Sequence, residues 1–354
     1  MKLKNWFWAI LGLVFLGIRF LASTFPEKTE QVYSEGIFLW IRKIIDQTLG
    51  ILPFPSVYFF WLSVILVLIY FFIRLRKKDS LRNKLGYTFR AILNGTGALV
   101  FFFLILWGFN YQRVPLTKKL RLDIRPLELE EVKREIFETE MEMNRLRPQI
   151  HSDTSAFEIP WDYPVLETEV RKELEEHSHL LRLTYTGRPR TKQVPPKGLM
   201  RRLGILGIYW PFTGESYIDA ALHPLEKPFT IAHELSHSLG VTDEGEANFV
   251  AWVIGSESQN PHLNYTSQLR LLLYLMRDFS RMDPEGYAEW VKTLNRGIVN
   301  DILSIRKNAD RYPPISLEFS RAANNVFLKT QGVKEGVKSY QQMPMLVHAW
   351  RKRN

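Results

Sequence analysis

Three long apolar runs constrain this chain more than any other feature of its sequence. They cover residues 6–22, 57–73 and 91–109. Each run approaches the roughly 20 residues that a helix needs to cross a bilayer. Two of them are flanked closely by basic and aromatic residues, which are typical of membrane–water interfaces. We therefore expect three N-terminal transmembrane helices rather than three buried core helices.

The charges around these runs predict an orientation. The first run follows Lys2 and Lys4 but lacks a small-x-small cleavage site, which favours an uncleaved anchor over a signal peptide. Residues 74–90 carry seven Lys/Arg and one Asp. The positive-inside rule then places the N-terminus and this loop in the cytoplasm. Three crossings leave residues 111–354 outside the cytoplasmic (inner) membrane, with the lipid bilayer as an expected partner.

The sequence divides into a membrane anchor, residues 1–110, and a water-soluble domain, residues 111–354. In the soluble domain, turn signals around PFTGE predict two short strands near 203–210 and 215–220. Residues 183–200, rich in Pro, Arg, Lys and Thr, are predicted to be a loop. Periodicity and capping residues predict helices near 127–147, 165–182, 228–239, 244–256, 265–280, 283–308, 315–330 and 335–350. The expected fold class is membrane-anchored α+β: three transmembrane helices, then a mostly α-helical domain with a small β-hairpin or sheet.

Composition excludes several classes of function. The formal net charge is +10, but residues 1–110 hold 13 Lys/Arg against only 5 Asp/Glu. The excess therefore lies beside the apolar runs, and no basic stripe points to nucleic acid as a partner. The chain contains no Cys, which excludes disulfides, thiolate metal sites and a cysteine nucleophile.

The strongest chemical signal is His233-Glu234-Leu235-Ser236-His237, an HExxH pattern within a predicted helix. Residues four apart share one helix face, so both imidazoles can reach one ion. Glu234 is offset by one position and is expected to act as general base rather than ligand. Zinc would lower the pKa of a water to about 7 and polarise a carbonyl. Glu234 would take the proton from that water and pass it to the leaving amine.

Three acids compete to be the third metal ligand. The spacing from His233 to Asp243 resembles a metzincin pattern in which Asp replaces the usual third His. Glu244, with Asn248 four residues later, resembles the ExxAD-like segment of gluzincin-type membrane proteases, with Asn in place of Asp. We rank Glu244 first and Asp243 second, and expect Glu246 to be a helix N-terminal acid that the metal does not use.

Several further segments resemble one family over nearly the full chain. They are PFPSVYFF, GFNYQRVPL, YWPFTGESYID, PFTIAHELSHSLG, EGEANFVAW and GVKEGVKSY. Together they resemble the uncharacterised bacterial domain-of-unknown-function family 3810. The resemblance implies a membrane-anchored protein with a zincin-like HExxH domain, and it favours Glu244 because the family's glutamate before the x-E-A-N run falls there.

The strands before the motif carry a second expectation. In zincins an edge strand beside the active-site helix pairs with an extended peptide, so GIYW (207–210) or ESYID (215–219) would bind substrate, or the hairpin only packs on the helix. Tyr265, Tyr274 and His262 are the candidates for stabilising an oxyanion, and no spacing selects among them.

The function expected from the sequence is a membrane-anchored zinc metallopeptidase that cleaves an extracytoplasmic peptide or protein. Its metal ligands would be His233, His237 and Glu244, with Glu234 as general base. The alternative is a non-catalytic envelope protein with a structural metal site. A transport or signalling role is less expected, because three spans are few for a transporter.

Overall fold

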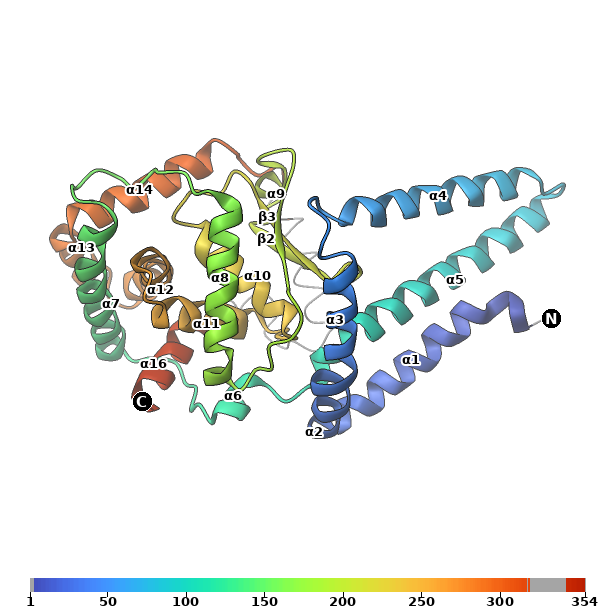
Figure 1. Cartoon of the computed structure of the whole chain (residues 1–354), viewed down its shortest axis with the longest axis horizontal. Helices are drawn as coiled ribbons and strands as arrows, with labels where there is room; N and C mark the ends of the chain where they lie inside the picture. Colours follow the sequence, from blue (N-terminus) through green and yellow to red (C-terminus); the bar gives the residue numbers. More distant parts are fainter. Residues whose placement is uncertain (1–2, 317, 319–341, 354) are drawn as a thin grey trace. The chain divides into compact units, whose positions relative to one another are not determined.

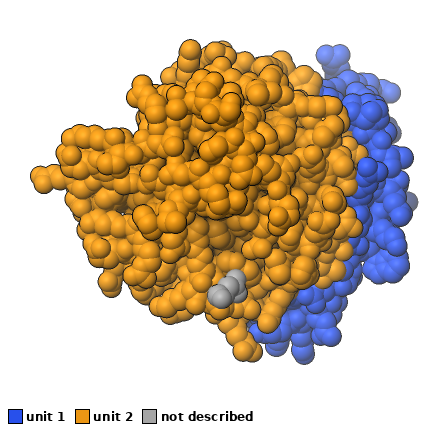
Figure 2. All heavy atoms as spheres, turned by 60° about the vertical axis from the view of Figure 1, so that its left-hand side comes forward, with its two compact units in different colours: residues 1–114, 186–188, 210–215 blue, residues 115–185, 189–209, 216–354 orange. Residues whose placement is uncertain are grey.

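The structure is a computed structural model that describes residues 3–316, 318 and 342–353. It is mostly helical, with one small three-stranded sheet, which confirms this coarse part of the expected fold class. The chain divides into two compact units (Figure 2). Unit 1 contains residues 1–114, 186–188 and 210–215, and unit 2 contains the rest. Two short segments of the later sequence therefore belong with the N-terminal unit.

Unit 1 contains three helices that are long and apolar enough to cross a membrane. They are α1 (Phe7–Thr24), α4 (Val57–Arg76) and α5 (Leu81–Leu106), drawn in blue and teal in Figure 1. Only 6% of the most apolar window of α4 is buried. A helix that is apolar on every side and yet unburied suits lipid rather than a protein core. The three expected apolar helices are thus present, and they point to association with a membrane.

The third of these helices begins earlier than predicted. Residues 74–90 were expected to form a loop, but only 77–80 lie between α4 and α5. Ser80 accepts a hydrogen bond from the backbone N–H of Asn83 at 3.2 Å and so caps α5. Because no strong helix breaker separates this cap from the apolar run, the basic residues continue the helix instead of preceding it.

Helices α1 and α5 approach each other closely through small residues. A Cβ built on Gly12 would lie 2.6 Å from the Cα of Gly97. Asn94 accepts hydrogen bonds from the backbone N–H groups of Trp8 at 3.1 Å and Ala9 at 3.3 Å. Close backbone approach at glycines, with a polar side chain across the interface, is typical of membrane helix pairs.

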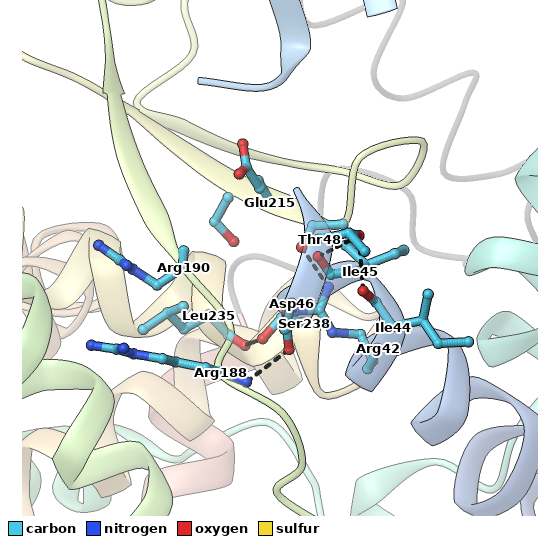
Figure 3. Close-up of polar contacts among 12 residues, drawn as sticks. Arg42, Ile44, Ile45, Asp46, Thr48, Arg188, Arg190, Glu215, Leu235 and Ser238 are labelled. Carbon is cyan, nitrogen blue, oxygen red and sulfur yellow. Dashed lines mark hydrogen bonds and ion pairs between the residues drawn. The ribbon is translucent and has the colours of Figure 1, made fainter. Parts of the chain in front are cut away.

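The segment between α1 and α4 forms α2 (Pro26–Thr29), a π-helix (Glu30–Ile37) and α3 (Phe38–Thr48). α3 buries Arg42 and Asp46 while it exposes Trp40 and Ile44. Arg42 pairs with Asp46 (Figure 3). Arg42 also donates to the backbone carbonyl of Gly214. Asp46 also accepts from the backbone N–H of Arg188 at 2.9 Å.

A second buried acid completes this arrangement in unit 1. Glu215 accepts hydrogen bonds from the backbone N–H of Ser56 at 2.9 Å and from its hydroxyl at 2.7 Å. Glu215 is 1% exposed, so its carboxylate has lost its hydrogen bonds to water. The two bonds from Ser56 take their place. Buried polar contacts thus account for the presence of residues 186–188 and 210–215 in unit 1.

The remaining helices of the described chain belong to unit 2, apart from two short 3-10 helices, Leu3–Trp6 and Gly108–Gln112. The unit contains α6 (Leu116–Leu120), α7 (Leu129–Ile150), α8 (Tyr163–His177), a 3-10 helix (Ser178–Leu181), α9 (Leu199–Arg202), α10 (Lys227–Ser238), α11 (Glu244–Glu257), α12 (Pro261–Met282), α13 (Pro284–Thr293), α14 (Arg296–Asp310) and α16 (Met343–Arg353).

Most of the predicted helices of this unit are present, but one prediction was wrong. The helix expected over 283–308 is two helices, α13 and α14. Asn295 caps α14 by accepting from the backbone N–H of Gly297 at 2.8 Å, so the chain restarts there. Most of the helix expected near 315–330 and the first part of the one near 335–350 lie outside the described residues.

The sheet has the order β1-β3-β2, with β1 (Thr191–Val194), β2 (Gly207–Trp210) and β3 (Glu215–Asp219). Both expected strands are therefore present. β1 was missed, because residues 183–200 had been predicted to be a loop. It pairs in parallel with β3, with Thr191 opposite Ser216. This partner lies more than twenty residues away, so no local pattern announces the strand.

The core of unit 2 is built around α10, α11 and α12. Every residue of α10 from Pro228 to Ser238 is buried. α11 is buried along nearly its whole length, from Gly245 to Gly255. α12 buries one long face that includes Leu269, Leu272 and Leu275. The helix that bears the two motif histidines is thus enclosed, which limits the freedom of its polar side chains.

Candidate metal centre

The HExxH motif lies on α10, as the sequence predicts. Pro228 stands in the first turn of this helix, where its missing N–H has no intrahelical partner to lose. The helix places His233 and His237 one turn apart on one face, with ring centres 4.9 Å from each other. Both rings are buried, at 8% and 6% exposure.

The chain then turns back at Gly240 and begins α11. Gly240 has φ of 82°, a left-handed conformation that glycine adopts without strain. Asp243 follows as the N-cap, and its carboxylate accepts from the backbone N–H of Glu246 at 2.9 Å. Glu244 is therefore the first residue of α11, and its side chain returns toward the two histidines.

Three side chains meet at one point. The Nε2 atoms of the two histidines are 3.3 Å apart. Glu244 Oε2 lies 3.1 Å from His233 Nε2 and 3.5 Å from His237 Nε2. Ligand atoms about 2.0–2.2 Å from a tetrahedral zinc ion are about 3.3–3.6 Å apart. Two imidazoles and one carboxylate form a donor set that catalytic zinc uses, so these residues fit the ion in chemistry and in spacing.

The two rings differ in how their other nitrogen is held. His237 Nδ1 donates to the carbonyl of Val241 at 2.7 Å, which leaves Nε2 of the neutral ring as the acceptor that a metal needs. His233 Nδ1 is buried, and none of the described residues accepts a hydrogen bond from it. The orienting bond that usually supports a metal-bound histidine is thus seen for one ring of the pair.

Burial opposes charge on every member of the cluster, and the neighbours decide the outcome. Burial lowers the pKa of His237, but Glu244 outweighs it and raises that pKa to about 9. Burial prevails at His233 and lowers its pKa, with the positive charges of His237 and Arg270 acting in the same direction. Although burial raises the pKa of Glu244, the two histidines hold it well below its usual range.

Glu234 lies beside these three residues and against β2. Burial raises the pKa of its carboxyl to about 8, while the backbone N–H of Tyr209 donates to it and opposes the rise. A Cβ added at Gly207 would lie only 2.4 Å from Glu234 Oε1. The hydroxyl of Ser216 donates to the backbone carbonyl of Glu234 at 2.8 Å and ties β3 to α10. A carboxyl with this pKa can take up and release a proton near neutral pH.

The other acids have different partners. Asp243 uses its carboxylate as the cap of α11, and Glu246 accepts from the backbone N–H of Thr117 at 3.1 Å. Among the described residues, two groups of three side chains have potential ligand atoms close enough to share one metal ion. The group on α10 and α11 contains Glu244 and neither Asp243 nor Glu246. The other group lies on α8 and includes an exposed residue, Glu176, beside Glu173 and His177.

Asn248 donates to the hydroxyl of Tyr274 at 3.4 Å. The sequence compares it with the acid that supports a ligand in gluzincins, but its side-chain amide bonds to this phenol instead. The hydroxyl of Tyr265 donates to Asp301 at 2.6 Å, and Asp301 also forms a buried ion pair with Arg147. The ring of His262 packs on Trp161. Of the three oxyanion candidates, Tyr274 is therefore the one bonded to a residue one turn from Glu244.

Sequence reasoning missed Arg270. Its guanidinium lies over the rings of Phe229 and Tyr274, at 5.7 and 5.1 Å from their centres. Only the packing of α12 against α10 brings it to the site, so its position in the sequence gave no signal.

The fold and the site define a membrane-associated, mostly helical protein with a buried His–His–Glu cluster. The chain belongs to the family described as protein of unknown function DUF3810, whose family model matches residues 33–348. The resemblance noted in the sequence is thus confirmed at the level of the family. No curated protein and no solved structure gave a significant match.

Proposed function

We propose that this protein is a zinc metallopeptidase of the zincin type, anchored in the cytoplasmic membrane by α1, α4 and α5. Its domain beyond the third span would act outside the cytoplasm on a peptide or protein. The observation that carries the proposal is the convergence of His233, His237 and Glu244, whose ligand atoms lie 3.1–3.5 Å apart.

In this proposal His233, His237 and Glu244 hold the ion, and Glu234 is the general base. When bound, zinc would supply Lewis acidity and a water of lowered pKa. Glu234 would act as the general base that accepts a proton from the attacking water as the water oxygen bonds to the peptide carbonyl carbon. Glu234 would then pass this proton to the amine that leaves when the C–N bond breaks.

β2 is the strand that we propose for peptide binding. The sequence alone does not choose between GIYW and ESYID, or between a substrate-binding strand and a hairpin that only packs on the helix. β3 lies in the middle of the sheet and has neighbours on both sides, whereas β2 lies at its edge. β2 also contacts Glu234 through Gly207 and Tyr209. An extended peptide added to this edge would pass beside the proposed base.

The donor set supports a catalytic metal over a structural one. Structural zinc sites are closed by four protein ligands, whereas catalytic sites keep one position open. Among the described residues, the close group at α10 and α11 contains three potential ligands. A general base directly after the first histidine has no role in a purely structural site.

The proposal is tested by the variant Glu234→Gln in the full-length, zinc-loaded protein in detergent. A library of quenched-fluorescence peptides serves as substrate, and bound zinc is measured in parallel. Glu234→Gln is expected to lower hydrolysis by ~10²–10⁴-fold, because a general base contributes that much, and to retain the metal. Hydrolysis that survives this change contradicts the mechanism, and zinc-loaded wild-type protein that cleaves no peptide contradicts the peptidase.

A further inference from the structure

One face of α12 carries a ladder of two arginines around a tyrosine. Arg270, Tyr274 and Arg277 are spaced four and three residues apart, which places them on one side of the helix. The guanidinium carbons of Arg270 and Arg277 lie 5.1 and 5.3 Å from the centre of the Tyr274 ring. Arg270 also donates to the Tyr274 hydroxyl at 3.4 Å.

This ladder begins one helical turn from two of the proposed metal ligands. Arg270 lies over the ring of Phe229, which precedes His233 by four residues on α10. Tyr274 accepts from Asn248, which follows Glu244 by four residues on α11. Two independent helices thus place the same cationic group beside the cluster.

The arginines have hydrogen-bonding capacity that the described part of the chain does not use. Arg270 Nε and both Nε and Nη2 of Arg277 are buried nitrogens that find no acceptor there. Nor does either guanidinium lie within 4.0 Å of a carboxylate of the described residues. Buried donors without acceptors are costly, and such groups are commonly completed by a ligand or an ion.

Stacking explains only part of this arrangement. An aromatic face stabilises a guanidinium through its π electrons, but the N–H groups at the edge of the guanidinium still require acceptors. A carboxylate supplies two acceptor oxygens in the geometry that matches this edge.

We propose that Arg270 and Arg277 bind a carboxylate of the substrate beside the metal centre. This inference rests on the proposed peptidase function and names its substrate class. Arg270 lies over Phe229, which is one helical turn from His233, so a carboxylate bound there would lie near the bond that is cleaved. The preferred substrate is therefore a peptide with a free C-terminus near that bond.

A carboxylate at this position has two sources, the chain terminus and an acidic side chain. The test uses three dye-labelled pentaalanine probes: the free acid, the C-terminal amide, and an amide with one alanine replaced by glutamate. Binding to full-length, zinc-loaded protein in detergent is measured by fluorescence polarisation. The Glu234→Gln background prevents cleavage during the measurement.

The free acid is expected to bind ~10-fold to 100-fold more tightly than the plain amide, as a bond between charged groups would provide. Arg270→Gln is expected to abolish that difference, and Arg270→Lys to restore part of it, because lysine keeps the charge but loses the planar fork. Arg281→Gln, which changes an exposed arginine of the same helix, is the matched control and is expected to leave it intact.

Each outcome decides the proposal. Equal binding of acid and amide, no binding of either, or a preference that survives both Arg270→Gln and Arg277→Gln contradicts the carboxylate site. A preference for the glutamate amide over the free acid overturns the assignment to a C-terminus. A preference that depends on Arg270 in a protein that cleaves no peptide keeps the carboxylate site and contradicts the peptidase, so the two failures are distinguishable.

Discussion

At the scale of single residues, the centre depends on which atoms each neighbour leaves available. The backbone carbonyl of Val241 accepts a hydrogen bond from His237 Nδ1, so Nε2 is the nitrogen that faces the other proposed ligands. The carboxylate of Asp243 accepts a backbone hydrogen bond as the N-cap of α11, whereas the carboxylate of Glu244 points to the histidines. Gly207 leaves room for Glu234, because any side chain there would collide with the carboxylate. The polar side chains of this centre would therefore behave differently if one of these neighbours changed.

Gly207 provides the sharpest residue-scale prediction. In Gly207→Val the new side chain is expected to displace Glu234, because the three atoms nearest to a Cβ at this position all belong to Glu234. The backbone of Gly207 does not have a positive φ, and valine suits a strand, so the fold is expected to tolerate the change. Hydrolysis is expected to fall ~10²-fold, as a displacement of about 1 Å can cause, while bound zinc stays constant.

The control for this variant is Ile208→Val, whose side chain leaves the opposite face of β2. Peptide hydrolysis and zinc content are measured together for both proteins. Unchanged hydrolysis in Gly207→Val would show that Glu234 is not constrained by β2 in the way its contacts indicate.

At the scale of elements, the sequence predicts the helices whose ends depend on nearby residues, and it misses the elements that depend on distant partners. The helices α10 and α11 follow from Pro228, Gly240 and the acids after it, so they were found in the sequence with nearly their observed ends. The strand β1 depends on pairing with β3, and the break between α13 and α14 depends on a single cap. Neither has a strong local pattern, and both were missed.

Some residues of the candidate site can likewise be predicted from the sequence, and others only from the folded structure. The spacing of HExxH predicts that His233 and His237 share a face and that Glu234 is offset from them. Choosing among the acids needed the turn at Gly240 and the cap at Asp243, which fix where Glu244 points. Arg270 had no sequence signal at all, because it reaches the cluster only through the packing of α12 on α10.

The contact between α1 and α5 yields a prediction for the membrane helices. A Cβ on Gly97 would lie 2.2 Å from the carbonyl oxygen of Trp8, whereas one on Gly17 would meet nothing within 4 Å. Gly97→Leu is expected to separate the two helices and lower the melting temperature in detergent by several degrees or more, of order 2–4 °C per kcal/mol lost. Gly17→Leu is the matched change.

A melting temperature that responds equally to both substitutions would contradict the close approach of the two helices. A drop confined to Gly97→Leu supports it. Intrinsic fluorescence on heating is a suitable measure, because Trp8 lies in the contact itself.

At the scale of the whole molecule, the distribution of charge predicts which side of the membrane each part occupies. The basic residues around the α4–α5 connection predict that this connection lies in the cytoplasm. An odd number of spans would then place the C-terminal domain on the other side. The absence of Cys from the chain makes a direct test convenient, since any introduced thiol is unique.

Single variants Asp79→Cys and Glu285→Cys place one thiol in the α4–α5 connection and one on α13, both at exposed positions. In intact cells a membrane-impermeant maleimide is expected to label position 285 and to spare position 79. After the cells are opened, both are expected to react. Labelling of position 79 alone in intact cells would invert the proposed orientation and move the metal centre into the cytoplasm.

The central claim is that His233, His237 and Glu244 hold one metal ion. The measurement that tests it most directly is zinc per full-length chain, determined by mass spectrometry for the wild type and for single alanine variants. We expect about one zinc per chain in the wild type, as this donor set implies, with loss in His233→Ala, His237→Ala and Glu244→Ala. Asp243→Ala and Glu246→Ala are expected to keep it. A wild type that takes up no zinc, or a Glu244→Ala variant that keeps its zinc while Asp243→Ala loses it, would contradict the account.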